Sequence, residues 1–178
     1  MKKMYLILIG VLVIVLMSSC AGEFIFREHH FGDTVDQIQA GEGEPDDVIS
    51  EIEGWESIVY PDIQLWDGYE ARLVYSLKDD SLEYIIATGC IDIKTDVADA
   101  KTDLKSLLQL GKPNKETDQG QGYKMLWKKS GYTAVLVVSS GSFTLVYGAD
   151  TDRVAAYYET MMLTSLYRTD SNPDQPGL

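Results

Sequence analysis

The chain has 178 residues, of which 45% are apolar and 24% are charged, a composition typical of a folded globular protein rather than a disordered one. Fifteen Lys and Arg residues stand against 28 Asp and Glu residues, which gives a net charge of −13. This excess of acids argues against a nucleic-acid-binding protein and against a polybasic membrane-surface protein. The two cysteines are too few for a disulfide-rich scaffold or a cysteine-based zinc finger.

The first element is an N-terminal export signal. Two lysines precede an apolar run of 13 residues that ends at Met17. A helix that spans a bilayer needs about 20 apolar residues, so this run is too short and predicts the apolar region of a signal peptide over residues 1–19.

The end of this signal carries a recognisable motif. Ser18 and Ser19 stand directly before Cys20, with Leu16 and Met17 upstream, and this stretch resembles the lipobox of bacterial lipoproteins. The resemblance implies that Cys20 receives a thioether-linked diacylglycerol and becomes the mature N-terminus. The protein would then be anchored by lipid at the extracytoplasmic face of the cell membrane. The alternative is an ordinary secretory signal followed by a chance cysteine.

A short tether is predicted for residues 20–31, and a folded domain is predicted for residues 32–168. Thr34 and Gln37 have the spacing of a capping box and predict the start of a short helix. Gly43 followed by Pro45 predicts its end. The last ten residues, 169–178, are rich in Pro and Gly and predict a disordered tail.

Strands follow this first helix. The segment Trp55–Ile63 is one candidate, and Tyr69–Leu77 and Leu82–Cys90 form the arms of a hairpin whose apolar residues alternate. Cys90 lies at the end of an apolar run, so we expect it to be buried as a small apolar side chain.

A similar order of elements is predicted further along the chain. Apolar residues at helical spacing begin near Thr95, and Gly111-Lys112-Pro113 is the predicted stop. A three-stranded meander follows, then a helix from Asp150 to about Tyr167. The strands of the meander are Tyr123–Lys128, Tyr132–Ser139 and Ser142–Tyr147.

These elements predict an α+β fold. Strands joined by tight turns pair antiparallel, and we expect the helices to cover one face of the sheet in a two-layer domain. The order of elements further suggests a tandem repeat of one helix and three strands, with units at about 32–92 and 95–168.

One family resemblance concerns the first of these units. Gly32, Thr34, Ile38, Gly43 and Pro45, followed by strands, resemble the small lipoproteins of the outer-membrane-protein assembly machinery and the β-lactamase inhibitor protein fold. The resemblance implies a repeated helix-plus-antiparallel-sheet unit that binds proteins and has no catalytic residues.

Candidate catalytic and metal-binding groups are few. His29 and His30 are the only histidines, and adjacent residues on an extended segment point to opposite sides, so we expect a solvated junction rather than a metal site. Seven acids occur between Glu42 and Glu56, without the spacing of a calcium-binding loop, and predict a solvated loop. We therefore expect no metal, no cofactor and no enzymatic activity, although a zinc site that uses one histidine remains an alternative.

Aromatic residues gather in the first unit. Trp55, Tyr60, Trp66 and Tyr69 lie within one loop-rich stretch, and exposed Tyr and Trp are good contact anchors. We interpret the four as a candidate binding surface. For Trp55 and Trp66 a place in the core is equally consistent with the sequence, and for Trp127 and Tyr75 we expect the core.

The function that these patterns favour is a non-catalytic module that binds a protein or another component of the cell envelope. One alternative is a small envelope hydrolase or metal-dependent enzyme that uses the His29 and His30 region. Another is a structural spacer without a specific ligand. No nucleic-acid partner is expected.

Overall fold

A computed structural model describes residues 26–92, 95–118, 122–156 and 158–159. The predicted signal peptide, Cys20 and the predicted tail lie outside these residues. The elements in chain order are α2 (Val35–Glu42), β1 (Asp47–Ile49), β2 (Trp55–Trp66), β3 (Tyr69–Lys78), β4 (Ser81–Cys90), α3 (Val97–Leu108), β5 (Lys115–Asp118), β6 (Gly122–Lys129), β7 (Tyr132–Ser139) and β8 (Ser142–Gly148). Helical turns follow at 151–156 and 158–159.

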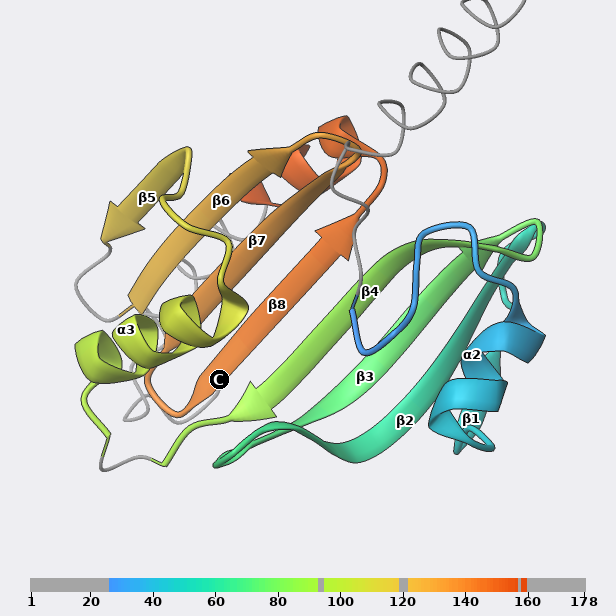
Figure 1. The fold of residues 1–178 in the computed structure, drawn as a ribbon, viewed down its shortest axis with the longest axis horizontal. Coiled ribbons are helices and arrows are strands. Elements are labelled where there is room, and N and C mark those ends of the chain that lie inside the picture. Colours follow the sequence, from blue (N-terminus) through green and yellow to red (C-terminus); the bar gives the residue numbers. More distant parts are fainter. Residues whose placement is uncertain (1–25, 93–94, 119–121, 157, 160–178) are drawn as a thin grey trace, which may run out of the picture.

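The eight strands form a single sheet in the order β1-β2-β3-β4-β8-β7-β6-β5. All neighbouring strands are antiparallel, which confirms the predicted α+β class. The edge strands β1 and β5 were not predicted, because both are short and almost wholly exposed and show no alternation of apolar residues. The two halves of the chain meet where β4 pairs with β8 (Figure 1).

Apolar residues cover both faces of the sheet. In β7, Ala134, Leu136 and Val138 belong to one buried cluster and Val135 belongs to another, because successive side chains of a strand point to opposite faces. Both faces of this interior strand are therefore covered, as its apolar sequence predicted.

The helices are divided between these two clusters. Helices α2 and α3 contribute to the larger one through the buried residues Ile38, Ala100, Leu104 and Leu108. Val154 and Tyr158 belong to the smaller one. The C-terminal helical turns that carry them lie behind the sheet in Figure 1. The expectation that all helices lie on one face is therefore wrong for these turns, because the second apolar face also has to be covered.

The ends of the helices follow the sequence in part. Thr34 and Gln37 form the predicted capping box, and Gly43, with φ 93°, ends α2 as predicted. Helix α3 begins after Asp96 and ends at Gln109, whose φ of 52° is left-handed. This end comes before the predicted stop at Gly111, whose carbonyl instead accepts a hydrogen bond from Trp127 Nε1.

Residues 26–31, predicted as part of a tether, are packed into the domain. Phe26 and His29 are buried and exchange two backbone hydrogen bonds of 2.9 Å. Backbone hydrogen bonds from Gly32 to Leu82 and from Leu82 to Asp33 join this segment to β4. The folded domain therefore includes residues N-terminal to the predicted boundary at Gly32.

Cys90 was expected to be buried, and this expectation is wrong: its side chain is exposed at the end of β4. The alternation of the strand turns Gly89 toward the core instead. A Cβ atom at Gly89 would lie 2.3 Å from the Glu70 carbonyl oxygen and 2.4 Å from the Phe143 ring. Only glycine fits at this point of the β4–β8 pairing.

A buried lysine lies beneath the C-terminal helical turns. Lys124 of β6 is 1% exposed, its Nζ donates to the Tyr158 carbonyl oxygen, and the ammonium group lies 4.3 Å from the centre of the Tyr158 ring. Burial lowers the pKa of Lys124 to about 8, because an apolar environment disfavours the charged form.

This lysine makes stability depend on pH. Its folded-state pKa lies below the ordinary value of 10.5, so the unfolded chain binds more protons between about pH 8 and pH 10.5 and stability rises with pH over that range. We expect Lys124→Met to raise the melting temperature at pH 7 and to lose this advantage by pH 10. Thermal unfolding at both values measures the difference, with Lys128→Met, at an exposed position of the same strand, as the control. An equal effect at both pH values would contradict the prediction.

Candidate functional site

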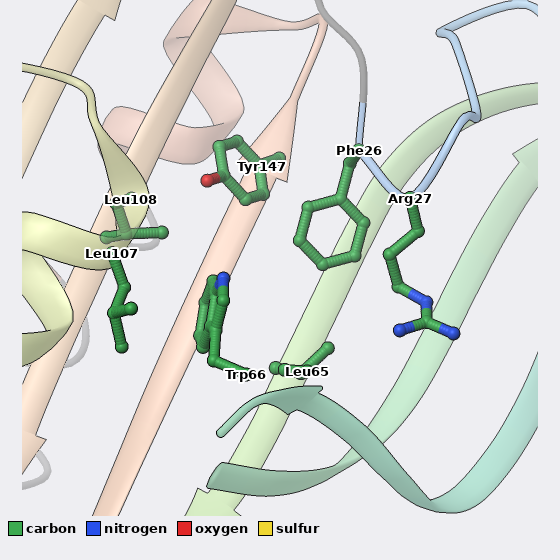
Figure 2. A pocket seen from close by; sticks show the side chains of 7 residues that line it. All are labelled: Phe26, Arg27, Leu65, Trp66, Leu107, Leu108 and Tyr147. Carbon is green, nitrogen blue, oxygen red and sulfur yellow. The ribbon is translucent and has the colours of Figure 1, made fainter. Parts of the chain in front are cut away.

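A hollow of about 200 Å³ opens on the sheet face that carries α2 and α3. We call it the hollow, and its lining residues are Phe26, Arg27, Leu65, Trp66, Leu107, Leu108 and Tyr147. Figure 2 shows that these side chains come from the N-terminal segment, the end of β2, α3 and β8. Aromatic and aliphatic groups form most of the lining and Arg27 is its charged residue, a composition common in binding sites.

Trp66 is the one predicted site residue that lines the hollow. It ends β2 directly before the turn into β3, is half-buried, and its ring meets Tyr69 edge to face at 6.5 Å. The Tyr69 hydroxyl donates to Asp103 of α3 at 2.9 Å. Tyr69 therefore ties the start of β3 to α3, and the Trp66 ring packs against this anchored side chain.

Two of the four predicted surface aromatics lie in the core instead. Tyr60 is 3% exposed and Tyr69 is 8% exposed. The Tyr60 hydroxyl donates to the Gly43 carbonyl at 3.0 Å. Burial raises the pKa of both tyrosines, that of Tyr69 to about 12 with a further contribution from Asp103. Neither ring is available as a surface contact.

Trp55 lies away from the hollow, at the other end of β2. It pairs with Lys78, whereas Trp66 pairs with Tyr69 at the opposite end of the same two strands. The Trp55 ring stacks on Tyr84 at 5.7 Å, and the Arg153 guanidinium lies 5.5 Å from its centre. The four predicted aromatics therefore do not form one surface, because the length of the β-hairpin separates the two tryptophans.

Arg27, the charged residue of the hollow, is held by the buried carboxylate of Glu42. Arg27 donates from Nε and Nη2 to the two oxygens of Glu42, at 2.8 and 3.0 Å, and from Nη1 to the Gln64 carbonyl. The Tyr75 hydroxyl also donates to Glu42, at 2.6 Å. This cluster joins the N-terminal segment, α2, β2 and β3, so the wall of the hollow formed by Phe26 and Arg27 is held in place.

These contacts shift the ionisation of the cluster. Burial raises the pKa of Glu42, but the hydrogen bonds from Arg27 and Tyr75 outweigh it, and the net pKa lies below the usual value. Burial and the negative charge of Glu42 raise the pKa of Tyr75. Glu42 is thus held ionised although its side chain is only 4% exposed, and it is not part of the solvated acidic loop that the sequence suggested.

His29 lies in the same cluster, and the expectation of a solvated junction is wrong for this residue. It is 4% exposed, and its ring meets Tyr75 edge to face at 5.4 Å. Its Nε2 lies 3.5 Å from Glu42 and its Nδ1 lies 3.7 Å from Asp33. A Cβ at Gly41 would lie 2.8 Å from this ring, so the ring is enclosed by the domain.

The residues that the structure describes offer no evident metal centre. Within those ranges, no group of three or more His, Cys, Asp and Glu side chains is arranged to hold an ion. His30 is half-buried beside His29, and its backbone N–H donates to Asp33 at 2.8 Å.

The sequence did not predict most of the residues that form the hollow and the Glu42 cluster. Phe26 and Arg27 were assigned to a tether, and Glu42 was counted with the acidic loop. One signal was present: Arg27 is the only Lys or Arg between Lys3 and Arg72. In so acidic a stretch, a single arginine is the natural partner for a buried carboxylate.

Comparison with protein-family models, with curated proteins and with solved structures finds no match. Within the part of the chain that the structure describes, no helix is long and apolar enough to cross a bilayer.

The Glu42 cluster makes a prediction about acid stability. Because the folded-state pKa of Glu42 is depressed, its contribution is present above the ordinary carboxylate pKa and is lost as the pH falls through the folded value. We expect Glu42→Gln to lower the free energy of unfolding by about 2 kcal/mol at pH 7 and by less at pH 3, which lies below the ordinary carboxylate pKa of 4.5. Denaturant titrations at both values measure this, with the exposed neighbour Glu44→Gln as the control. An equal loss of stability at both pH values would contradict the conclusion that ionised Glu42 stabilises the fold.

Proposed function

We propose that this protein is an extracytoplasmic lipoprotein, anchored to the cell membrane through Cys20, and that it acts as a non-catalytic binding module. The observation that carries the binding role is the hollow, with a half-buried tryptophan on a rigid frame. Fixed aromatic side chains at the edge of a concave surface give large contact area at low entropic cost. The bound component would be a protein or another constituent of the cell envelope.

The short distance in sequence between Cys20 and the hollow supports an envelope component as the bound partner. Phe26, which lines the hollow, follows Cys20 by six positions. An extended segment of this length spans about 20 Å. A lipid on Cys20 would therefore keep the hollow within reach of the membrane surface.

The proposed tandem repeat has support in the order of the elements. Helix α2 is followed by four strands, β1 to β4, and α3 is followed by four more. The sheet order places β1 and β5 at opposite edges and joins the two halves at β4 and β8, as expected for two similar units related by a two-fold axis. Each unit would then contain four strands rather than the three suggested by the sequence.

The alternative of an enzyme that uses His29 and His30 has less support. The His29 ring is enclosed by Tyr75, Glu42 and Gly41, so a substrate would reach it only after the N-terminal segment had moved. A general base has to lie within hydrogen-bond reach of the proton that it removes.

The binding role is tested by site-specific photo-crosslinking in cells. A photoreactive amino acid at Leu107, which lines the hollow, should give one dominant adduct, and the same group at the exposed Glu70 should not. Trp66→Ala should weaken the interaction by about 2 kcal/mol, or roughly 30-fold in affinity, and thus remove the adduct. Trp55→Ala is the matched control, and melting temperatures of both variants show whether they fold. Equal adducts from both positions, or none, would contradict the proposal.

The lipid anchor is tested separately. We expect Cys20→Ser to abolish incorporation of labelled palmitate and to release the protein from the membrane fraction, because the acyl chains supply the binding energy. Cys90→Ser, which changes the other cysteine, should leave both properties unchanged. Membrane retention of Cys20→Ser without palmitate would point to an uncleaved signal segment as the anchor.

A further inference from the structure

One edge of the sheet carries the exposed apolar residues of the domain. Among the described residues, the large apolar side chains classed as exposed are Val48, Ile49 and Ile52, with exposed fractions of 48%, 38% and 67%. Val48 and Ile49 belong to β1, and Ile52 lies in the turn that follows it. We call these three residues, with the free side of β1, the β1 edge. Val48 pairs with Ile58 and Ile49 pairs with Ser57, so the two exposed side chains flank the free side of β1 from opposite faces of the sheet.

The opposite edge of the sheet is protected from further strand pairing. Strand β5 has the sequence Lys-Glu-Thr-Asp, and its side chains are engaged: Lys115 pairs with Glu159, and Glu116 pairs with Lys101 and Lys105. Charged edge strands resist pairing with other chains. The β1 edge exposes Val48 and Ile49 beside Asp47, whereas β5 carries paired charges, so the two edges differ in their side-chain chemistry.

The backbone of β1 is also accessible to a partner strand. Strand β1 is the first of the sheet and pairs with β2 alone. The Val48 backbone N–H donates to the side chain of its neighbour Asp47 at 2.9 Å, a local contact that a partner carbonyl can replace. An outer strand of this kind is the usual acceptor for an added β-strand.

Charge identifies the kind of partner. Residues 28–71 contain 13 Asp and Glu residues and no Lys or Arg, and the acids nearest the β1 edge are exposed: Glu44, Asp46, Asp47, Glu51 and Glu53. A second copy of this chain would bring identical acids opposite one another, which is destabilising. A segment that carries Lys or Arg would be attracted instead.

We propose that the β1 edge is a second binding site, separate from the hollow, and that it accepts an extended basic peptide segment as an additional strand. Because side chains of a strand alternate between two faces, the segment places its apolar side chains against either Val48 or Ile49. Its Lys or Arg side chains then lie on the other face, where they meet the surrounding acids. The main chain of the segment pairs with β1.

The test uses a dye-labelled, acetylated peptide of alternating lysine and valine residues and the purified full chain. We expect fluorescence anisotropy to show binding that weakens with added salt, and hydrogen exchange to show new protection at residues 46–52. A peptide with glutamate in place of lysine should not bind.

Two variants locate the site. Glu51→Lys combined with Ile52→Lys changes exposed side chains only and should weaken binding by about tenfold or more. Val48→Pro removes an edge N–H, a change that edge strands tolerate, and should also weaken binding. Glu70→Lys, an exposed Glu-to-Lys change on β3, should bind as the unchanged chain does.

Several outcomes would overturn the proposal. They are equal binding of the glutamate peptide, no binding at millimolar peptide, protection at the hollow instead of residues 46–52, and self-association of the chain through β1 in sedimentation experiments. Because Trp66→Ala should leave peptide binding intact, failure of this proposal is distinguishable from failure of the hollow as a binding site.

Discussion

The pairing of β4 with β8 is the constraint on which the rest of the domain depends. Seven residue pairs, from Tyr84 with Gly148 to Cys90 with Ser142, join the two halves of the chain into one sheet. These residues are more than fifty positions apart in sequence, so the pairing forms only when the chain closes a long loop. The Phe143 ring packs against Gly89 at this seam, where a larger residue would displace it. Without this seam, α2 and α3 would have no common sheet face.

The hollow is a consequence of that shared face. Its lining comes from both halves, with Trp66 from the first and Leu107, Leu108 and Tyr147 from the second. The remaining wall, formed by Phe26 and Arg27, is held by the bidentate contact between Arg27 and Glu42. In this pair the carboxylate is buried and the guanidinium is one-third exposed, and the two parallel hydrogen bonds set the orientation of Arg27 relative to α2. The cluster therefore matters most for the shape of the hollow.

The two edges of the sheet show how one fold can present different surfaces. The β5 edge carries both signs of charge and pairs them with neighbouring elements. The β1 edge lies in a stretch without any basic residue and exposes apolar side chains. Proteins usually protect both edges because unprotected ones associate. A sheet edge that is surrounded by acidic side chains favours basic partners over copies of the same chain.

Local patterns in the sequence determined much of the secondary structure. The capping box of α2, the hairpin of β3 and β4 and the meander of β6 to β8 were all predictable, because caps, turns and alternating apolar residues act over a few positions. Short, exposed edge strands leave no such pattern, so β1 and β5 were missed. Only the tertiary structure decided that Tyr60 and Tyr69 are core while Trp66 borders a hollow, and that Arg27, His29 and Glu42 meet. Burial and charge pairing between distant residues depend on how the two halves come together, and no short segment of the chain contains that information.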